Sequence, residues 1–561
     1  MPRPFRRLLA LGLACLKLVA AESPAVPPEL QSTFNRGQVL FAANCSMCHQ
    51  LSGRGAAGSY PPLAASDWLQ QNRRLAIRAV VAGLKEPITV NGVRYHGQMP
   101  PALLTDQQVA DVLTFVMNSW GNPGGRVIAP EVAVVRAKTD FPTFDALKRA
   151  SDFRPLPAAP AGFTVTETAR LPDFATRLAS DRLGKSLFVL GLNGSVWRLD
   201  LATKKFKQLV WPTNYTDLRP GDFSTLGLTL DAERRLWISF NQRIASRPLV
   251  TNEVGILRTS AIDAEGDPVA PKLWFRTGYP HGIGPYNHGV SDLRFGPDGR
   301  LYLASGSRTD GGEAGTDPQL GQMGETDITA AVWRFDPKAT KPQLEVVARG
   351  IRNAYSLNWD GAGNLFTVAN GPDAHAGEEM DHVVPPKAGE PPRHHGFPYQ
   401  LGLTPAGHRW YPHTPEAPAG IQFALPVENV GPDALAGSKP TATFTPHSSP
   451  AGLEWLDASW PESVRIGFLM GRFGNLITTG DEQDCGFDVL SVKLERTAEG
   501  RWQARTKTFL APLGRPMDVH VAGGKVYVLE YTRPTRFKEQ VGWLPGRIIE
   551  VAPVGATAKA Q

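Results

Sequence analysis

Residues 45–49 read Cys-Ser-Met-Cys-His, and no other run constrains the chain so strongly. Two thiols separated by two residues and followed directly by an imidazole are the arrangement that attaches a c-type haem. Cys45 and Cys48 can each add to one vinyl group of a porphyrin, and His49 is then held on the iron as an axial ligand. The chain has only four cysteines, so a chance match is uncommon. We therefore predict one covalently attached haem c near the N-terminus.

Two other chemistries use a pair of cysteines at this spacing, namely half of a zinc site and a dithiol redox pair. A zinc site would need two further ligands at a suitable distance along the chain, and the sequence has no second Cys-x-x-Cys. The histidine that follows the second cysteine directly favours haem over both alternatives.

The other face of the iron also needs a ligand, and Met99 is the residue we expect there. It lies directly before Pro100 and Pro101, which stiffen the loop. A thioether ligand raises the haem potential relative to a second histidine. His96 is the competing candidate, because imidazole also binds iron. Alternatively, Met99 fills a gap in the core.

Two helical patterns flank these ligands. The first covers residues 34–45, and the second begins at Thr105, a residue type that caps helices. The apolar positions of the second pattern follow the helical period: Val109, Val112, Leu113, Val116 and Met117. Residues 30–121 thereby resemble the small class I cytochromes c, in which an N-terminal and a C-terminal helix cross beside the haem. The resemblance implies that the loop Tyr60–Leu63 supplies the carbonyl that accepts the proximal imidazole proton.

The composition permits two or three domains with separate cores, since the chain has 561 residues of which 42% are hydrophobic. Its formal net charge is +6, a mild excess that is spread along the sequence. Because no basic stripe is interleaved with aromatic residues, we expect no nucleic-acid partner.

Residues 1–21 have the features of a secretory signal peptide. Three arginines lie within the first seven residues, and an apolar run follows them. The run is too short for a membrane span and is interrupted by Lys17, so we expect no transmembrane segment in the mature chain. Because haem c is attached outside the bacterial cytoplasm, the signal and the haem motif together predict a periplasmic protein. Lipid anchoring at Cys15 and twin-arginine export are alternatives.

A Pro- and Ala-rich stretch over residues 122–162 follows the first domain. Segments such as Pro155–Pro160 cannot hold a helix or a central strand, so this stretch is predicted to be a semi-rigid tether. We therefore place a domain boundary here.

Residues 163–555 consist of short apolar runs separated by Gly-containing turns. Six segments share a strand, a turn of the Asp/Asn-Gly type and a second strand. They lie near Leu187, Leu236, Leu293, Leu357, Ile466 and Val519. Such a repeat predicts an all-β propeller, with six blades, or seven if residues 375–450 hide one. Separate β-sandwiches are the alternative. The fold class is therefore multidomain, with a small all-α domain before the propeller.

The propeller region also resembles a known family. The stretch Gly350–Leu357, followed by Ala369–Pro372 and Glu378–Asp381, is similar to the glucose/sorbosone dehydrogenases. These are soluble quinoprotein propellers that use pyrroloquinoline quinone (PQQ) with calcium. His288 has the offset of the family's catalytic histidine, and Gly514–Val519 resembles its C-terminal cofactor-contact strand.

The resemblance implies a role for two residues in oxidation. His288 would be the base that takes the hydroxyl proton of the substrate, while the quinone takes the hydride. Arg352 would stabilise negative charge that develops on the quinone oxygen.

The resemblance also implies which residues hold the cofactors. Asn353 would hydrogen-bond to PQQ, and Arg515 and Arg472 would pair with its carboxylates. The backbone carbonyls of Gly371 and Pro372 would face calcium, a hard cation that binds oxygen.

Three positions depart from the soluble glucose enzymes. Ser307 stands where those enzymes carry an acid that orients the catalytic histidine, and Met517 replaces a second arginine near the cofactor. Asp222 stands where those enzymes have a glutamine. These departures resemble the sorbosone-type branch and leave the substrate open. The acidic run Glu378–Asp381 is expected to be a solvated loop, with a structural calcium site as the alternative.

The sequence thus predicts a periplasmic quinohaemoprotein dehydrogenase that oxidises a sugar, an osone or a small alcohol or aldehyde. Electrons would pass from PQQ to the tethered haem c and then to a downstream cytochrome or another respiratory acceptor. The alternative is a cytochrome c electron carrier whose propeller is a PQQ-free binding or scaffold module.

Overall fold

A computed structural model describes residues 26–554, with gaps. The gaps are 51, 56–59, 72, 85–86, 97–98, 103, 139–152, 182–183, 212–222, 245–249, 264–268, 283–287, 314–323, 375, 406, 413, 437–438, 463, 466, 476–483 and 537–543. The predicted signal segment, residues 1–21, the alternative anchor Cys15 and Asp222 lie outside the described residues.

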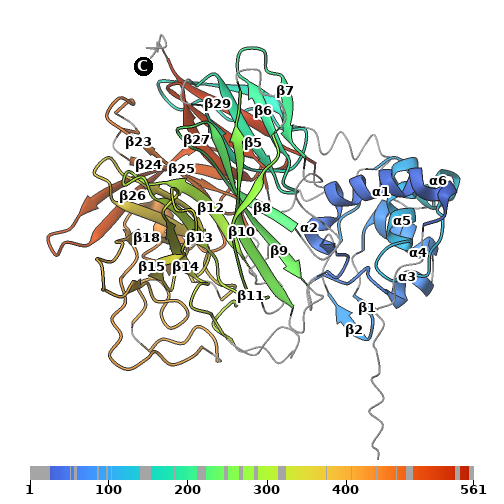
Figure 1. Ribbon diagram of the computed structural model, residues 1–561, viewed down its shortest axis with the longest axis horizontal. Helices are drawn as coiled ribbons and strands as arrows, with labels where there is room; N and C mark the ends of the chain where they lie inside the picture. Colours follow the sequence, from blue (N-terminus) through green and yellow to red (C-terminus); the bar gives the residue numbers. More distant parts are fainter. Residues whose placement is uncertain are drawn as a thin grey trace, which may run out of the picture.

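The N-terminal domain is helical and lies beside the β-structure (Figure 1). Its helices are α1 (Gln31–Asn44), α2 (Ser46–His49), α3 (Asp67–Gln71), α4 (Arg73–Ala82), α5 (Asp106–Met117) and α6 (Ala129–Arg136). A short hairpin joins β1 (Ile88–Val90) to β2 (Val93–Tyr95). Helix α5 begins at Thr105, whose side chain accepts the backbone N–H of Gln108 in a capping box, as the sequence predicts.

Helices α1 and α5 cross at close range. Gly37 lies at the crossing, and a Cβ there would overlap the backbone carbonyl oxygen of Asp111. The ring of Phe115 packs 5.4 Å from Phe41 and 5.2 Å from Trp120, measured between ring centroids. The predicted crossing of an N-terminal and a C-terminal helix is therefore confirmed, and a glycine makes it possible.

The helical domain extends further than the sequence indicated. Helix α6 falls inside the stretch assigned to the tether, yet its Val132 and Val135 are buried in the core formed by α4 and α5. The expected boundary at residue 121 is thus too early, because one short amphipathic helix is hidden in Pro- and Ala-rich sequence. The described part of this domain ends near residue 138.

Within the described residues, the remaining strands form a six-bladed β-propeller, which confirms the predicted fold class. Blade 1 contains β4 (Ala175–Ser180), β5 (Ser186–Gly191), β6 (Val196–Asp200) and β7 (Phe206–Val210). Blade 2 contains β8 (Phe223–Leu230), β9 (Arg235–Ile244), β10 (Thr251–Ala261) and β11 (Lys272–Pro280). Blade 3 contains β12 (Val290–Phe295), β13 (Leu301–Ser305), β14 (Ala331–Phe335), β15 (Glu345–Arg349) and the added β19 (Arg393–His394).

Blade 4 contains β16 (Ala354–Trp359), β17 (Leu365–Ala369) and β18 (Glu379–Val383). Blade 5 contains β23 (Pro450–Leu456), β24 (Gly467–Arg472), β25 (Asp488–Arg496), β26 (Trp502–Leu510) and the added β20 (Glu428–Asn429). Blade 6 contains β27 (Pro516–Ala522), β28 (Lys525–Glu530), β29 (Arg547–Pro553) and β3 (Phe163–Arg170). Strand β3 comes from the start of the region and pairs with β29 at its end, which closes the ring.

Residues 375–450 do not add a seventh blade among the described residues. Apart from β18, they hold the short strands β19 and β20 and a small hairpin of β21 (Leu435–Ala436) with β22 (Lys439–Pro440). The strands β19 and β20 of this region extend blades 3 and 5 instead.

In each blade consecutive strands run outward from the innermost one as an antiparallel meander, and β3, β19 and β20 are added at the outer edges of blades 6, 3 and 5. The six inner strands (β4, β8, β12, β16, β23 and β27) therefore run in one direction and pack on one another around the channel. A buried ion cluster joins them, with Arg177 of β4 lying 3.2 Å from Asp518 and 3.7 Å from Asp292. The first residues of these strands meet at one end of the channel, which we term the channel mouth.

Candidate functional site

The Cys-x-x-Cys-His motif lies at the end of α1 and in α2. His49 is buried, and its Nδ1 lies 3.1 Å from the carbonyl oxygen of Pro61, within the loop that the resemblance implied. With Nδ1–H donating to this carbonyl, Nε2 is the nitrogen left for iron. Burial raises the pKa of Cys45 to about 12 and that of Cys48 to about 11, so both thiols stay protonated. Two adjacent thiols and an oriented imidazole fit a covalently attached haem.

Met99 and His96 lie in different environments. Met99 exchanges two backbone hydrogen bonds of 2.9 Å with Leu84. Its side chain is half-buried and packs against the same helical core as Cys45. His96 is exposed. This packing supports Met99 over His96 as the second ligand of a haem bound at His49.

His288 lies directly before β12, at the channel mouth. Its Nδ1 is 3.1 Å from both the hydroxyl and the carbonyl oxygen of Ser307. Burial, and then the charge of Arg352, lower the pKa of His288 to about 3, so the imidazole is neutral near pH 7. Gly306 lets the chains approach, because a Cβ there would crowd His288 and the side-chain oxygen of Asn353. The structure thus brings the candidate base His288 together with Ser307, Arg352 and Asn353.

Arg352 is buried in a polar network just before β16. Its guanidinium pairs with Asp310 at 2.5 Å and donates to the carbonyl oxygens of Asn370 at 3.0 Å and Gly371 at 2.7 Å. The hydroxyl of Tyr411 donates to the other carboxylate oxygen of Asp310. Among the described residues, the buried side-chain oxygen of Asn370 has no hydrogen-bond partner. An unsatisfied acceptor beside the arginine is a position where a polar ligand would be stabilised.

Arg472 and Arg515 lie near the channel mouth with different partners. Arg472 bonds to Asp488 at 2.7 and 2.6 Å and also pairs with Asp433, so carboxylates already balance its charge. Arg515 donates to the backbone carbonyls of residues 473–475. Burial lowers the pKa of Arg515 to about 9. Because its cation is costly to bury, Arg515 suits a carboxylate ligand better than Arg472 does.

The acidic run after Gly371 is buried rather than solvated. Glu378 and Glu379 are 2% and 4% exposed, and Asp381 is fully buried. Strand β18 carries them into blade 4, where Glu378 accepts the backbone N–H of Gly371 at 2.5 Å. Burial raises the pKa of Glu378 to about 7. The prediction of a solvated acidic loop is therefore wrong.

The predicted calcium ligands are the carbonyl oxygens of Gly371 and Pro372. The oxygen of Gly371 already accepts from Arg352, and a calcium ion at this oxygen would face the guanidinium charge. In the part of the chain that the structure describes, no three His, Cys, Asp or Glu side chains are grouped to hold a metal ion. As placed, the residues do not fit calcium, and no step below uses it.

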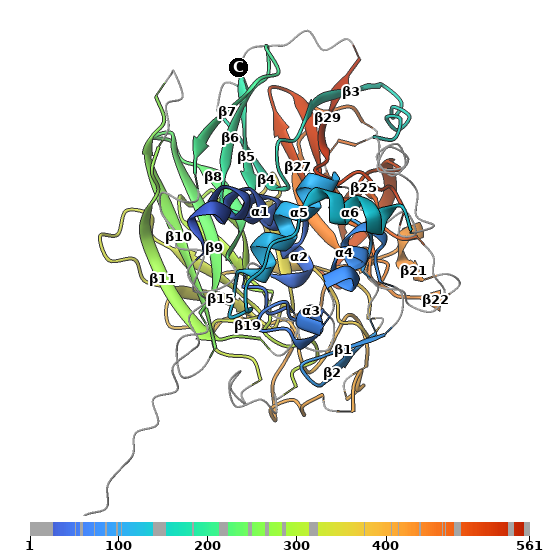
Figure 2. The same cartoon turned by 90° about the vertical axis from the view of Figure 1, so that its right-hand side faces the viewer.

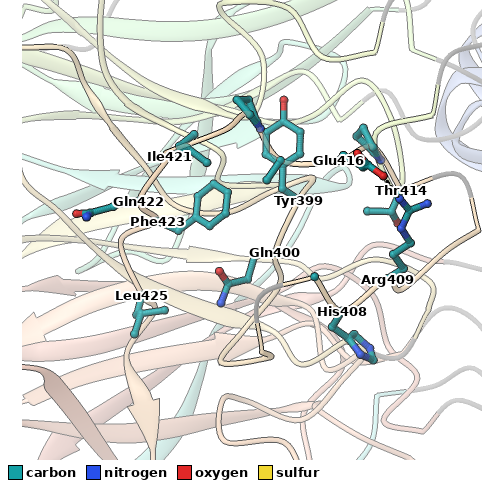
Figure 3. Close-up of a pocket in the computed structure, with 14 residues that line it drawn as sticks. Tyr399, Gln400, His408, Arg409, Thr414, Glu416, Ile421, Gln422, Phe423 and Leu425 are labelled. Atoms are coloured by element: carbon teal, nitrogen blue, oxygen red, sulfur yellow. Dashed lines mark hydrogen bonds and ion pairs between the residues drawn. The ribbon is translucent and has the colours of Figure 1, made fainter.

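A cavity of about 740 Å³ lies in the long loop between β19 and β20 (Figure 3). Tyr399, Gln400 and Phe423 line it, and the two aromatic rings stack with their centroids 6.1 Å apart. The same loop carries Tyr411, which bonds to Asp310. The cavity and the Arg352 network are thus connected through one loop.

Comparison with known families identifies the helical part of the chain. Residues 34–120 match the family model described as cytochrome c. The N-terminal region is a cytochrome c domain. Residues 246–394 match a model described as a domain of unknown function (DUF7133), which spans parts of blades 2, 3 and 4.

The curated relatives match over a short part of the chain. Cytochrome c-552 of Thermus thermophilus is 36% identical over 85 residues, which is 14% of this chain and 65% of that protein. The cytochrome c subunit of the quinone-type alcohol dehydrogenase of Gluconobacter oxydans is 30% identical over 112 residues, 18% of this chain and 22% of that subunit. The fructose dehydrogenase cytochrome subunit of Gluconobacter japonicus is 31% identical over 106 residues, with the same two shares. The chain therefore spans less than two thirds of each of these relatives.

Solved structures match the propeller region at low identity. The PQQ-bound aldose sugar dehydrogenase of Streptomyces coelicolor is 19% identical, with 70% of this chain and 99% of that chain covered and a TM-score of 0.46. The apo form of the aldose sugar dehydrogenase of Escherichia coli is 16% identical, with shares of 70% and 99% and a TM-score of 0.46.

The cytochrome c domain presents its haem motif to the propeller. Helix α2 lies between the rest of the domain and the β-structure, and the orthogonal view places it in front of the ring (Figures 1 and 2). On the propeller side, Tyr531 at the end of β28 lies within electrostatic reach of Cys48. Strand β28 is antiparallel to β27, so Tyr531 is at the channel mouth, at the same end as His288 and Arg352.

Three residues of the site carry no motif in the sequence. Asp310 and Tyr411 come from loops and meet Arg352 only in the folded ring. Tyr531 lies within electrostatic reach of Cys48, although almost 500 residues separate the two along the chain. A buried arginine such as Arg352 needs a nearby counter-charge, but no local pattern identifies Asp310 as its partner, because the two residues are 42 positions apart.

Proposed function

We propose that the chain is an exported quinohaemoprotein dehydrogenase, which oxidises a sugar, an osone or a small alcohol or aldehyde. The observation that supports this most directly is the position of His288 and Arg352 at the end of the propeller that faces the haem motif of the cytochrome c domain. The cytochrome c domain can collect electrons only if it lies close to the site where the substrate is oxidised. The tether also raises the effective concentration of the acceptor at that place.

His288 is suited to take the proton of a substrate hydroxyl. The hydroxyl of Ser307 donates to the carbonyl oxygen of Thr309 at 2.8 Å, so its oxygen is left to accept from Nδ1–H of His288. Nε2 is then the basic nitrogen. Arg352, whose charge lies close enough to lower the pKa of His288, would stabilise negative charge on an oxygen bound beside it. PQQ, when bound, would supply the acceptor for the hydride.

Three residues are placed to hold a polar cofactor of this kind. Asn353 and Asn370 offer side-chain amides next to Arg352, and the side-chain oxygen of Asn370 lacks a partner among the described residues. Arg515 offers a buried cation for a carboxylate. It adopts φ of 56°, a conformation that a non-glycine residue holds only when its surroundings enforce it.

A second candidate function is favoured because two arginines of the site already have carboxylate partners within the protein. Arg352 and Arg472 are both paired with carboxylates inside the protein. A propeller that has no PQQ could keep these pairs as structure, and the chain would then be an electron carrier with a binding or scaffold module. Occupancy by PQQ would instead require Arg352 to serve Asp310 and the ligand together.

The deciding experiment measures haem reduction by substrate. Purified haem-containing protein is loaded with PQQ, with and without Ca²⁺, and the reduced haem band is followed on addition of sugars and alcohols. Reduction supports the dehydrogenase, whereas PQQ binding without reduction by any substrate would contradict it. Failure to bind PQQ in either condition would favour the carrier.

A pair of histidine variants assigns the base. His288→Ala should abolish reduction by substrate while dithionite still reduces the haem. His382→Ala is the matched control, because His382 is also sheltered but lies between Phe366 and Trp502 in the outer part of blades 4 and 5. Equal loss in both variants would show that the effect is structural.

Export and an external electron acceptor belong to the same proposal. Among the described residues, no helix is long and apolar enough to cross a membrane. The covalent haem requires export from the bacterial cytoplasm, and a small one-electron acceptor such as a cytochrome would take electrons from the exposed side of the cytochrome c domain.

A further inference from the structure

The channel mouth carries a group of aromatic and sulfur side chains that oxidation of the substrate does not use. We term Phe174, Tyr355, Phe473, Met517 and Tyr531 the mouth cluster. The ring of Tyr531 packs 5.1 Å from Phe174 and 5.7 Å from Phe473, measured between centroids. The hydroxyl of Tyr355 lies 3.4 Å from the sulfur of Met517. All but Tyr355 are buried, so the cluster is packed rather than loosely exposed.

One side of the mouth cluster reaches the candidate active site. Tyr355 is on β16, three residues after Arg352. The backbone N–H of Tyr531 donates to the carbonyl oxygen of Arg515 at 2.9 Å. The guanidinium of Arg515 in turn lies over the ring of Phe473, 5.0 Å from its centroid. The cluster is therefore continuous with the residues proposed to hold the cofactor.

The other side of the mouth cluster reaches the cytochrome c domain. Strand β9 is antiparallel to β8 and therefore ends at the channel mouth, and its arrowhead points toward α2 in Figure 1. Cys48 would hold the edge of the porphyrin through a thioether bond, on the side of the cytochrome c domain that faces the propeller. Helix α2, which carries Cys48, lies in front of the ring in Figure 2.

The tether supports the same docking position. Phe153, the first described residue after residues 139–152, lies under three guanidinium groups, those of Arg170, Arg533 and Arg547, at 4.6, 4.3 and 5.3 Å from its ring centroid. All three arginines belong to blade 6, and Arg533 is two residues from Tyr531. The tether thus joins the propeller on the blade that faces Cys48.

We infer that Tyr531 is a positioning residue that receives the haem edge at Cys48, and that the mouth cluster is the path by which electrons leave the propeller. This inference rests on the proposed dehydrogenase. Each substrate molecule gives up two electrons and two protons. His288 would accept the hydroxyl proton of the substrate, and the electrons would cross the cluster one at a time, each able to reduce a ferric haem iron to the ferrous state. A one-electron acceptor of the ferric cytochrome class must reoxidise the iron between the two transfers.

A set of variants in the full haem-containing, PQQ-loaded protein tests the path. Tyr531→Leu removes the ring, and the rate of haem reduction by saturating substrate should fall on the order of 10- to 100-fold, as for other small misplacements of reacting groups. Tyr531→Phe keeps the ring and should stay within about twofold of the wild type. The matched control is Tyr527→Leu, since Tyr527 is buried on the same β28 but bonds to Glu550. An unchanged rate in Tyr531→Leu, or an equal loss in Tyr527→Leu, would overturn the inference.

A second measurement needs neither PQQ nor substrate. The photo-crosslinker p-benzoylphenylalanine is placed at position 531 or, as a control, at position 527 of the haem-containing protein. We expect cross-links from position 531 to peptides containing residues 45–60 and none from position 527. Absence of this cross-link at position 531 would overturn the docking. If the cross-link forms but the wild type is not reduced by any substrate, the proposed dehydrogenase fails while the docking position stands.

Discussion

The Nδ1 atom of His288 lies 3.1 Å from both the hydroxyl and the backbone carbonyl oxygen of Ser307. Both oxygens are neutral, and the hydrogen bond to the backbone of Ser307 raises the pKa of His288, although less than a carboxylate would. Burial and the charge of Arg352 act in the opposite direction, which lowers the pKa of His288 to about 3. The candidate base is therefore held in its neutral form across a wide pH range.

Replacing Ser307 by Asp should narrow that range. A carboxylate against Nδ1 stabilises the protonated imidazole and should raise the pKa of His288 by about one to three units. As the pH is lowered, the rate of haem reduction in Ser307→Asp should then begin to fall at a higher pH than in the wild type. Ser307→Asn, which is similar in size and neutral, should leave the acid limb in place. An unmoved limb in Ser307→Asp would show that His288 does not control it.

Breaking the buried pair of Arg352 and Asp310 should be strongly destabilising. Asp310→Asn leaves the guanidinium without its counter-charge at a site only 4–8% exposed, which should cost about 3–5 kcal/mol of unfolding free energy. Asp327→Asn is the control, since Asp327 pairs with Arg349 but is 89% exposed, and should cost less than about 1 kcal/mol. Urea unfolding of both variants measures the difference, and similar losses would contradict the importance of burial.

The protein should lose stability as the pH falls below neutral. Burial lowers the pKa values of His281 and His288 to about 3 and those of His382 and His394 to about 4, whereas the unfolded values lie near about 6.5. Between these values the four histidines bind more protons in the unfolded chain than in the folded one, so their protonation favours unfolding, and the raised pKa of the single carboxyl group of Glu378 offsets only part of this effect. The melting temperature measured by circular dichroism should therefore fall from pH 7 to pH 4. A flat profile would show that these histidines are solvated.

Met99 and His96 should respond differently to replacement. Met99→Ala should remove the thioether ligand, lower the reduction potential of the haem and change its visible spectrum, because the axial ligand sets both. His96→Ala should leave both unchanged, since His96 is exposed. A spectrum that changes only in His96→Ala would assign the second ligand to the histidine.

Local patterns predicted much of the fold. The helical period placed α1 and α5, and Thr105 marked the start of α5, because capping and amphipathic spacing are properties of neighbouring residues. The strand–turn–strand repeat predicted six blades for a similar reason. Helix α6 was missed because its two buried valines, Val132 and Val135, stand in sequence that resembles a linker, and only packing against α4 and α5 stabilises it.

The candidate site was predictable only in part. His288 and Arg352 could be located by their offsets, but the partners of Arg352 could not, since Asp310 is 42 residues away and Tyr411 lies in another loop. Burial of Glu378 was equally hidden, because an acidic run in sequence looks the same whether solvent or a β-blade surrounds it.

The haem motif at Cys45–His49 and the repeat that makes a propeller are both visible in the amino-acid sequence, because covalent attachment and blade formation depend on residues close together in the chain. The tertiary structure alone decided which end of the ring the haem motif faces and which charges surround Arg352. Closure of the ring by β3 and β29 brings the six strand starts to one mouth, and packing of the two domains then places α2, which carries the haem motif, in front of the ring (Figure 2). Distance through space, which spacing along the chain does not encode, therefore decides where electrons can leave.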